Sequence, residues 1–506
     1  MKGIMLQGTS SDVGKSLLAT ALCRIFFQLG YRTAPFKSQN MSNNSYVTKD
    51  GREIGRAQGL QAEAANIEAS VYMNPILLKP RSDMQSEVVL FGKSDGSLNG
   101  REYREGYYEK GLSAIGLSLE KLAESCDLIV IEGAGSPVEI NLNDRELVNM
   151  KIAELANVPV VLIADIERGG VFASIIGTLE LLSESEKSRV KGIIINKFRG
   201  DLSLFQDGVE WLECRTGIKV LGVIPYVEHQ IEGEDSLSLR QRLQWKDAKP
   251  IDIGVIKLSY LSNYTDIEPF LYEDDVSVRI IDQAESFGHP DALIIPGTRS
   301  TIRDLQSIKE SGLAEKVINY AKTGGVIVGL CGGYQMLSIT LLDESGSDTD
   351  HKGLLEKGLG ILPVHTIFER EKTTIRRKAI VNNKSGFPPI RLSGFEIHLG
   401  KTSNEPNAPG SSFLLSEDQY EEVDGWAVEN GRIIGTYFHH LFHNDEWRCE
   451  WLNRIRIQKG LTSKTIKPIE KTKSEKYDML AEHVKKHVNI EALLSIINEW
   501  KTEKNE

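Results

Sequence analysis

Near its N-terminus the chain reads Gly8-Thr9-Ser10-Ser11-Asp12-Val13-Gly14-Lys15-Ser16, between a short apolar segment and a helical run at residues 17–27. In a phosphate-binding loop, backbone amides and the start of the helix surround the phosphates, the Lys pairs with phosphate oxygens and the Ser hydroxyl holds Mg²⁺. The spacing from the first Gly to Gly-Lys-Ser is one residue longer than the usual pattern. Its place at the first strand-to-helix junction still predicts a site for ATP and Mg²⁺, formed by Gly8, Thr9, Gly14, Lys15 and Ser16.

A second part of this site is expected at the end of the apolar run 128–131, which Glu132 follows directly. Ligands of open parallel sheets bind beyond the carboxyl ends of the strands, so a carboxylate there is well placed to contact Mg²⁺ together with Ser16. Taken alone, Glu132 is equally well explained as a solvated acid at a strand end. Its combination with the phosphate-binding loop favours the metal-binding interpretation.

Short runs rich in Val and Ile alternate with helix-length segments through most of the chain, for example at residues 128–131, 158–163 and 192–195. This alternation is typical of βαβ units around a buried parallel sheet, and it predicts an α/β fold. With 506 residues the chain is too long for one hydrophobic core. We expect a first domain at residues 1–228, a polar linker at 229–250, a second α/β domain at 251–445 and a short helical C-terminal extension at 446–506.

The C-terminal extension carries apolar residues at intervals of three and four, which gives a helix one apolar face. These residues are Tyr477, Leu480, Val484, Val488, Leu493, Leu494 and Ile497. We expect this face to pack against the body of the protein rather than to bind a partner.

The charge, apolar stretches and cysteines of the sequence exclude several kinds of binding partner and site. The formal net charge is -11 and the sequence contains no basic stripe, which argues against a nucleic-acid partner. The longest apolar stretches are strand-sized and the N-terminus lacks the pattern of a signal peptide, so we expect no membrane association. The five cysteines are scattered without C-x-x-C spacing and indicate neither a disulfide framework nor a zinc site, so a reducing cytoplasm is the simplest setting. The sequence does not indicate an oligomeric state.

A second reactive centre is expected at Gly329-Leu330-Cys331-Gly332-Gly333-Tyr334-Gln335, which follows the apolar run 326–328. A strand that ends in a turn of small residues can lift a Cys nucleophile clear of the sheet, and nearby backbone N–H groups can then face a developing oxyanion. The nucleophile needs a base, and the candidates are His439 and His440. A buried, inert thiol is the plain alternative for Cys331.

The extended phosphate-binding loop, together with the strand that ends in Glu132-Gly133-Ala134-Gly135, resembles the dethiobiotin synthetase-like branch of P-loop NTPases. The resemblance implies that ATP phosphorylates a bound carboxylate and that a nitrogen nucleophile then attacks the acyl phosphate. Lys37 matches the substrate-side lysine of this branch, whose charge would be needed as phosphate approaches the carboxylate. Asn196 resembles the Asn with which the branch reads adenine.

The turn that holds Cys331 resembles class I glutamine amidotransferase domains, which release ammonia from L-glutamine through a thioester. By this resemblance His439, rather than His440, is the base. Most members of the class have Glu two residues after the His, but this chain has Leu441 at that position. The site is therefore a Cys-His dyad or takes its acid from elsewhere, for example from Glu396.

Ammonia from one domain and a carboxylate phosphorylated by the other give an amide, so the two predicted sites together indicate ATP-dependent amidation. Long polar stretches resemble the adenosylcobyric acid synthase family and span nearly the whole chain, at residues 36–45, 54–58, 74–80, 165–173, 196–201, 394–400 and 477–481. This resemblance implies amidation of the b, d, e and g propionate carboxylates of a corrinoid, adenosylcobyrinic acid a,c-diamide, with one ATP and one glutamine for each. Polar residues such as Gln39, Asn40 and Arg56 are expected to contact the corrin substrate.

Two alternatives stay open. A cobyrinic acid a,c-diamide synthase has both domain types, but it lacks a segment like Gln39-Asn40-Met41-Ser42. A P-loop switch or partitioning ATPase fused to an inactive glutaminase-like domain would use the same phosphate-binding loop. The reactivity of Cys331 distinguishes this last class from the amidotransferases.

Overall fold

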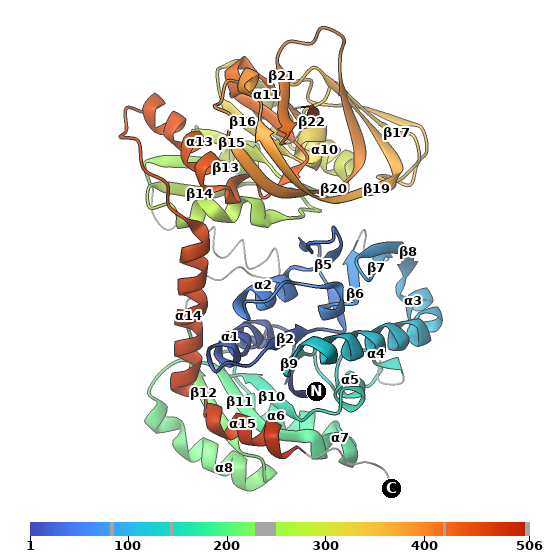
Figure 1. Ribbon diagram of the computed structural model, residues 1–506, viewed down its shortest axis with the longest axis vertical. Helices are drawn as coiled ribbons and strands as arrows, with labels where there is room; N and C mark the ends of the chain where they lie inside the picture. Colours follow the sequence, from blue (N-terminus) through green and yellow to red (C-terminus); the bar gives the residue numbers. More distant parts are fainter. Residues whose placement is uncertain (81–84, 142–144, 228–248, 418–420, 501–506) are drawn as a thin grey trace. The chain divides into compact units, whose positions relative to one another are not determined.

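The computed structural model describes residues 1–80, 85–141, 145–227, 249–417 and 421–500 (Figure 1). By its internal contacts the chain forms two units. Unit 1 comprises Met1–Ser42, Arg52–Ile231 and Lys471–Glu506, and unit 2 comprises Asn43–Gly51 and Glu232–Glu470. Apart from Lys249 and Pro250, the expected linker at 229–250 lies outside the described residues.

The two units differ from the expected domains in two places. Residues 43–51 belong to unit 2, although they lie inside the predicted first domain. The predicted C-terminal extension is divided, because its first part belongs to unit 2 and the part from Lys471 onward belongs to unit 1. Neither difference carries a signal in the sequence, because apolar spacing shows that a segment is buried but not what it is buried against.

Unit 1 is built on a parallel six-stranded sheet with the order β12-β11-β10-β1-β9-β2. Strands β9 and β10 are buried at every position, as expected of Val- and Ile-rich strands in the middle of a parallel sheet. The bounds are β1 Lys2–Gly8, β2 Thr33–Phe36, β9 Leu128–Glu132, β10 Val160–Asp165, β11 Val190–Phe198 and β12 Val220–Pro225. A smaller sheet of unit 1 has the order β3-β6-β7-β8, with β3 Gln39–Met41, β6 Ile76–Pro80, β7 Gln85–Leu90 and β8 Lys93–Asn99. The short strand β5 Glu53–Gly55 also belongs to unit 1, whereas β4 Ser45–Val47 belongs to unit 2.

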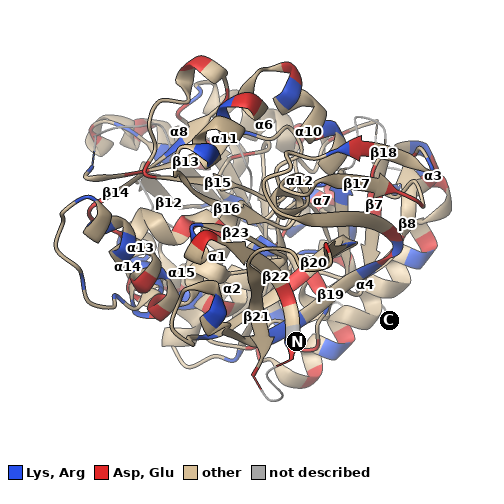
Figure 2. Cartoon of the chain, turned by 90° about the horizontal axis from the view of Figure 1, so that it is seen from above, with Lys and Arg blue, Asp and Glu red and all other residues tan. Residues whose placement is uncertain are grey.

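The helices of unit 1 follow its strands along the chain, as the βαβ pattern predicts. The α-helices are α1 Lys15–Gln28, α2 Arg56–Ala64, α3 Gly100–Gly106, α4 Tyr108–Ser125, α5 Met150–Leu155, α6 Val171–Leu181, α7 Glu184–Arg189, α8 Gln206–Thr216 and α15 Ile490–Glu499. Two 3-10 helices are η1 Val71–Met73 and η3 Leu202–Phe205. Figure 2 shows basic and acidic residues interspersed, for example along α4.

The C-terminal helices complete the core of unit 1. Helix α14 (Ile469–His487) and helix α15 contribute Tyr477, Leu480, Val484 and Leu493 to the same hydrophobic cluster as Ile4 of β1. The expectation that this apolar face packs against the body is therefore confirmed. After α14 the chain also joins the sheet edge, where Val488 bridges Gly222 of β12 (Figure 1).

Unit 2 contains a sheet whose main path is β14-β13-β15-β16-β23-β22-β21-β19-β17-β18, with β20 paired to β19 and β24 paired to β20. The pairs from β14 to β23 are parallel, whereas β23-β22, β22-β21 and β21-β19 are antiparallel. The bounds of the parallel part are β13 Ile251–Ile256, β14 Val276–Ile281, β15 Ala292–Ile295, β16 Val326–Leu330 and β23 Ile433–Thr436. The others are β17 Thr340–Asp343, β18 Leu354–Lys357, β19 Val364–Val381, β20 Arg391–Asn404, β21 Ser411–Ser416, β22 Glu422–Val428 and β24 Phe438–His439.

The parallel part of this sheet is covered on both faces. Val326 and Val328 of β16 belong to one hydrophobic cluster, whereas Ile327 between them belongs to another. Alternate residues of a strand point to opposite faces, so each cluster covers one face. The helices of unit 2 are α10 Thr301–Glu310, α11 Leu313–Lys322, α12 Gly332–Met336 and α13 Asp445–Gln458, and its 3-10 helices are η4 Tyr264–Tyr272, η5 Ala284–Ser286, η6 Asn383–Ser385, η7 Glu429–Gly431 and η8 Leu441–His443. Within the described ranges, no helix combines the length and apolar character that a bilayer span requires.

The packing of α14 leads to a first prediction. Leu480 is 5% exposed and lies in the core of unit 1, whereas its neighbour Met479 is 64% exposed. Leu480→Ala should lower the free energy of unfolding by about 2–5 kcal/mol, because it removes buried methyl groups and leaves a cavity. Met479→Ala should change it by less than about 0.5 kcal/mol. Denaturant unfolding of the two variants provides the comparison, and equal stabilities would show that α14 is not part of the core.

Candidate active sites

The phosphate-binding loop begins at the end of β1 and ends at the first residue of α1. Thr9 donates its backbone N–H to the Ile163 carbonyl at 2.9 Å, which ties the start of the loop to β10. Gly14 has a φ of 98°, and a Cβ atom there would lie 2.3 Å from Nδ2 of Asn196. Only glycine fits both conditions, so the sequence Gly14-Lys15-Ser16 fixes how the loop enters the helix.

Lys15 and Ser16 open helix α1 and face the interior of the loop. The Lys15 ammonium donates to the carbonyls of Ser10 and Gly135, each at 3.0 Å. The Ser16 hydroxyl donates to Oε1 of Glu132 at 2.7 Å. The structure therefore brings the predicted residues of the loop together with Glu132 at the carboxyl edge of the sheet.

Glu132 is the buried centre of this cluster, with 1% of its surface exposed. Lys37 contacts Oε1 at 2.8 Å, and the Gln61 side-chain amide donates to Oε2 at 2.7 Å. Burial raises the pKa of Glu132, but the Lys37 charge and the hydrogen bonds from Lys37, Ser16 and Gln61 outweigh it and lower the pKa. The carboxylate is therefore ionised, and the lysine that the sequence assigned to the substrate side lies against it.

The donors of this cluster suit a hard cation. A hydroxyl and a carboxylate 2.7 Å apart at a phosphate-binding loop are the oxygen ligands that Mg²⁺ takes when phosphates complete its coordination. In the described parts of the chain, no group of three or more His, Cys, Asp or Glu residues could hold a metal ion without such help. Ser16 and Glu132 thus fit Mg²⁺ that arrives with a nucleotide.

Asn196 lies on β11 and contacts the loop from the other side. Its amide nitrogen donates to the Val13 carbonyl at 2.8 Å. The next residue, Lys197, donates to Oδ2 of Asp165 at 2.8 Å and to the Asp12 carbonyl at 2.6 Å. Asn196 therefore holds the loop backbone, and its predicted contact with adenine stays a prediction.

Cys331 occupies a strained turn between β16 and α12. Its φ of 51° and ψ of −109° lie in a sparsely populated region that is typical of active sites. Its backbone N–H donates to the Thr436 carbonyl of β23 at 2.8 Å. A Cβ atom on Gly333 would lie 1.9 Å from the Ile295 carbonyl oxygen, so glycine is required for α12 to pack against β15. A Cβ atom on Gly332 would lie 2.6 Å from Cγ2 of Thr298, so the turn also favours glycine at that position.

His439 reaches the same edge of the sheet, because β23 is the neighbour of β16 and His439 follows it by three residues. The histidine is 1% exposed, and its ring stacks on Phe395 with 5.1 Å between centroids. His440 points elsewhere and stacks on His443. The predicted pair of Cys331 and His439 is therefore brought together in unit 2.

Asp266 is the carboxylate that contacts His439, and the sequence alone did not point to it. Its Oδ2 lies 2.6 Å from Nδ1 of His439, and its Oδ1 accepts the backbone N–H of His440 at 2.7 Å. Glu396 instead pairs with Arg377 and lies 3.5 Å from His398. Asp266 lies in η4 beyond the carboxyl end of β13, and this position was the only signal in the sequence. Many acids follow strands, so the signal does not select Asp266.

The charge of Asp266 controls the protonation of His439. Burial lowers the pKa of His439, but the Asp266 carboxylate and the interaction with Cys331 outweigh it and raise the pKa to about 10. An imidazolium at neutral pH stabilises a neighbouring thiolate, which is the nucleophilic form of cysteine. This geometry suits Cys331, His439 and Asp266 to the roles of nucleophile, base and orienting acid.

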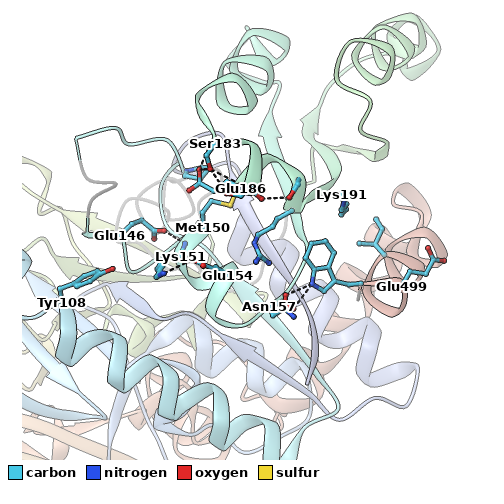
Figure 3. Close-up of a pocket in the computed structure, with 16 residues that line it drawn as sticks. Tyr108, Glu146, Met150, Lys151, Glu154, Asn157, Ser183, Glu186, Lys191 and Glu499 are labelled. Atoms are coloured by element: carbon cyan, nitrogen blue, oxygen red, sulfur yellow. Dashed lines mark hydrogen bonds and ion pairs between the residues drawn. The ribbon is translucent and has the colours of Figure 1, made fainter. Parts of the chain in front are cut away.

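A cavity of about 1180 Å³ in unit 1 contains neither reactive centre (Figure 3). Its lining includes Asn157, Ser183, Glu186, Lys191 and Trp500. Asn157 precedes β10, and the lining residues 183–189 precede β11. The cavity therefore lies at the amino edge of the parallel sheet, whereas the phosphate-binding loop lies at the carboxyl edge.

Comparison with known proteins agrees with the two-domain organisation. Residues 252–447 match the family description "CobB/CobQ-like glutamine amidotransferase domain", and residues 4–237 match "CobQ/CobB/MinD/ParA nucleotide binding domain". Cobyric acid synthase of Geobacillus thermodenitrificans is 48% identical over 98% of each chain. The chain belongs to the cobyric acid synthase family. Its relatives of that name include proteins of Geobacillus sp. WCH70, 49% identical over 97% of this chain and 96% of the relative, and of Nostoc sp. PCC 7120, 43% identical over 98% and 99%.

Membership of the cobyric acid synthase family confirms the predicted fold class, a nucleotide-binding P-loop domain followed by a glutamine amidotransferase domain. It also makes the chain a glutamine-dependent amidotransferase and ligase, as the paired sites predicted. The alternative of a switch ATPase with an inactive second domain is not favoured. A cobyrinic acid a,c-diamide synthase is not favoured either, because relatives that cover 98% of the chain carry the name cobyric acid synthase.

The contact between Asp266 and His439 leads to a second prediction. Asp266→Asn removes the charge that keeps His439 protonated, so the pKa of His439 should fall from about 10 toward its ordinary value. The alkaline limb of glutamine hydrolysis should then move to lower pH, and the rate at neutral pH should fall about 10²- to 10⁴-fold. Initial rates of glutamate release across the neutral and alkaline range measure both effects.

Glu396→Gln is the matched control for this prediction. It removes a buried carboxylate of the same domain that is bonded to Arg377 rather than to His439. The alkaline limb should stay in place in this variant. If the alkaline limb of the pH-rate profile shifts in Glu396→Gln but not in Asp266→Asn, the acid that acts on His439 is Glu396 rather than Asp266.

Proposed function

We propose that this chain amidates the b, d, e and g propionate carboxylates of adenosylcobyrinic acid a,c-diamide to give adenosylcobyric acid. One ATP and one glutamine would be consumed for each carboxylate. One observation carries the proposal: two sites occur in one chain of the cobyric acid synthase family. The first is a buried lysine-carboxylate pair beside the phosphate-binding loop, and the second is a Cys-His-Asp site. The partner is thus a small corrinoid, and the first site supplies an activated acid for the nitrogen that the second site releases.

In the ligase domain the chain would bring a propionate carboxylate in line with the γ-phosphate of ATP. A carboxylate oxygen attacks phosphorus, the bond to the leaving ADP oxygen breaks, and an acyl phosphate forms. Lys15 would pair with the phosphates, and Lys37 would offset the charge as two anions approach. Ammonia then attacks the acyl carbon, phosphate leaves with the electron pair of the broken C–O bond, and the nitrogen loses a proton to give the amide.

Ser16 and Glu132 would hold Mg²⁺ in this domain. The ion would neutralise charge on the phosphates when it is bound with ATP. Gly8, Thr9 and Gly14 would offer backbone to the phosphates. Lys37 already shares the Glu132 carboxylate with Ser16, so the same acid would connect the metal ligand to the substrate-side lysine.

In the glutaminase domain the Cys331 thiolate would attack the side-chain amide carbon of glutamine. His439, held by Asp266, would give its proton to the departing nitrogen, so that ammonia leaves and a thioester remains. Water activated by His439 would then hydrolyse the thioester to glutamate and return the thiol. The backbone N–H groups of Gly332 and Gly333 would face the oxyanion of the tetrahedral intermediates.

The cellular setting of the reaction is part of the proposal. The five cysteines are free, and a reducing cytoplasm would preserve the thiol that glutamine hydrolysis needs. The expected absence of nucleic-acid and membrane partners stays a prediction.

The proposed function predicts four successive products. The purified protein should convert adenosylcobyrinic acid a,c-diamide, with ATP, Mg²⁺ and glutamine, into species in which one to four acids have become amides. Mass spectrometry of the corrinoid measures each replacement, and omission of ATP should abolish all of them. An unchanged corrinoid mass would refute the named substrate.

Two variants should separate the two chemistries. Cys331→Ala should abolish amidation with glutamine but keep it with added ammonium salt, because only the nitrogen source is lost. Lys15→Ala should stop amidation with either nitrogen source while glutamine hydrolysis persists, because only phosphoryl transfer is lost. Glutamate release and corrinoid mass are measured in parallel. Equal loss under both nitrogen sources in Cys331→Ala would contradict separate sites.

A further inference from the structure

Residues 43–51 form an excursion of the chain from unit 1 into unit 2. Just outside this segment, Ser42 donates its backbone N–H to the Leu78 carbonyl at 3.0 Å, and Glu53 donates to the Gly92 carbonyl at 3.2 Å, so both flanks are held in unit 1. The middle of the segment is held in unit 2, where Val47 clusters with Phe395 and Ile397. A short segment anchored in this way transmits displacement of its flanks to the contacts of its middle.

The contacts of its middle surround the glutaminase site. Phe395 stacks on the ring of His439, and the Ile397 carbonyl accepts from the Cys331 thiol at 3.4 Å. The backbone carbonyl of Val47 in turn accepts from Nε of Arg376 at 2.9 Å. The segment therefore packs on the two residues that border Cys331 and His439.

A direct link to His439 runs through Asn263. The Ser45 backbone N–H donates to Oδ1 of Asn263 at 3.3 Å, and Nδ2 of Asn263 lies 3.4 Å from Nε2 of His439. A backbone N–H can only donate, so its partner on Asn263 must be the amide oxygen. This contact fixes the orientation of the amide and leaves its NH₂ group facing the histidine.

The NH₂ group of Asn263 faces Nε2 of His439, which is the ring nitrogen that would exchange a proton with the Cys331 thiol. Nδ1 is bonded to Asp266, so Nε2 is the atom left to accept the proton of the Cys331 thiol. In the imidazolium form of His439 Nε2 carries a proton, so two N–H groups would face each other across this contact. The Asn263 amide therefore favours the neutral imidazole over the imidazolium that pairs with a thiolate. In this conformation Asn263 therefore opposes formation of the thiolate.

We propose that Asn263 is a positioning residue that restrains glutamine hydrolysis, and that residues 43–51 set the restraint through the backbone N–H of Ser45. The inference rests on the proposed function for the identity of the ligands that bind near this segment. The preceding residues 37–41 include Lys37 and the expected corrin contacts Gln39 and Asn40. Binding of the acid substrate and ATP would draw on the flanks of the segment and withdraw Ser45. The Asn263 amide would then turn away from His439, and ammonia would be released only when a carboxylate is ready.

Substitutions of Asn263 test the restraint directly. Asn263 has a φ of 50°, which Gly and Asp tolerate, so Asn263→Gly and Asn263→Asp keep the backbone. Without ATP and corrinoid, Asn263→Gly should hydrolyse glutamine about fivefold faster than the unsubstituted protein, the factor that one net hydrogen bond represents. Addition of ATP and the a,c-diamide should no longer accelerate it. Asn263→Asp offers an oxygen to Nε2 and should move the alkaline limb of hydrolysis to higher pH.

Substitutions of Ser45 test the segment. Ser45→Pro removes the N–H and should reproduce the faster basal hydrolysis, whereas Ser45→Ala keeps the N–H and should behave like the unsubstituted protein. Amidation with added ammonium salt should remain normal in all four variants, which shows that they are folded. If Ser45→Pro fails to fold, the two Asn263 variants still test whether the amide restrains glutamine hydrolysis.

Two outcomes would overturn the inference. A basal rate in Asn263→Gly that is unchanged or lower would show that Asn263 does not restrain the site. Retention of the acceleration by ATP and the a,c-diamide in Asn263→Gly would show that coupling does not pass through this amide. The basal rate is independent of the named substrate, because failure of the unsubstituted protein to change the corrinoid mass would refute the proposed function while basal hydrolysis still reports on Asn263.

Discussion

A buried parallel strand must end in a turn where the backbone amides of the following helix are still unpaired, and this constraint places both reactive centres. At the end of β1 the turn contains Gly14, whose neighbours Lys15 and Ser16 open α1 toward Glu132 of the adjacent strand β9. At the end of β16 the turn contains Cys331, whose neighbour strand β23 leads to His439. In each case strand adjacency in a parallel sheet brings together groups that are more than 100 residues apart in sequence. The chemistry of each unit thus follows from which strand pairs with which.

Both centres also contain an ion pair that is almost completely buried. Lys37 with Glu132 and His439 with Asp266 are withdrawn from water, and desolvation opposes charge in all four groups. The pairs persist as ions because further donors satisfy the acids: Ser16 and Gln61 at Glu132, and the His440 N–H at Asp266. Removal of one partner would leave an uncompensated buried charge. Such pairs therefore hold their residues in one geometry even where they add little to stability.

The sequence predicted those parts of the fold and of the sites that local patterns determine. The strands at residues 128–131 and 326–328, the apolar face of α14 and the turns around Lys15 and Cys331 follow from apolar runs, spacing and glycines. Asp266 could not be predicted, because it lies 173 residues from His439 and only the tertiary fold selects it among many acids. Residues 43–51 could not be assigned to unit 2 for the same reason. Their polar sequence suits a substrate contact in unit 1 as well as a contact with Asn263.

The assignment of segments to units makes the two domains interdependent. The chain passes from one unit to the other at residues 42/43, 51/52 and 470/471, and once more between the described residues 227 and 249. A fragment that ended before α14 would lack Leu480 and Val484 and would expose the cluster that contains Ile4 of β1. A fragment that began at β13 would lack Val47, which covers Phe395 beside the His439 ring. Each chemistry therefore needs residues that the sequence places with the other, which is a physical reason for both to reside in one chain.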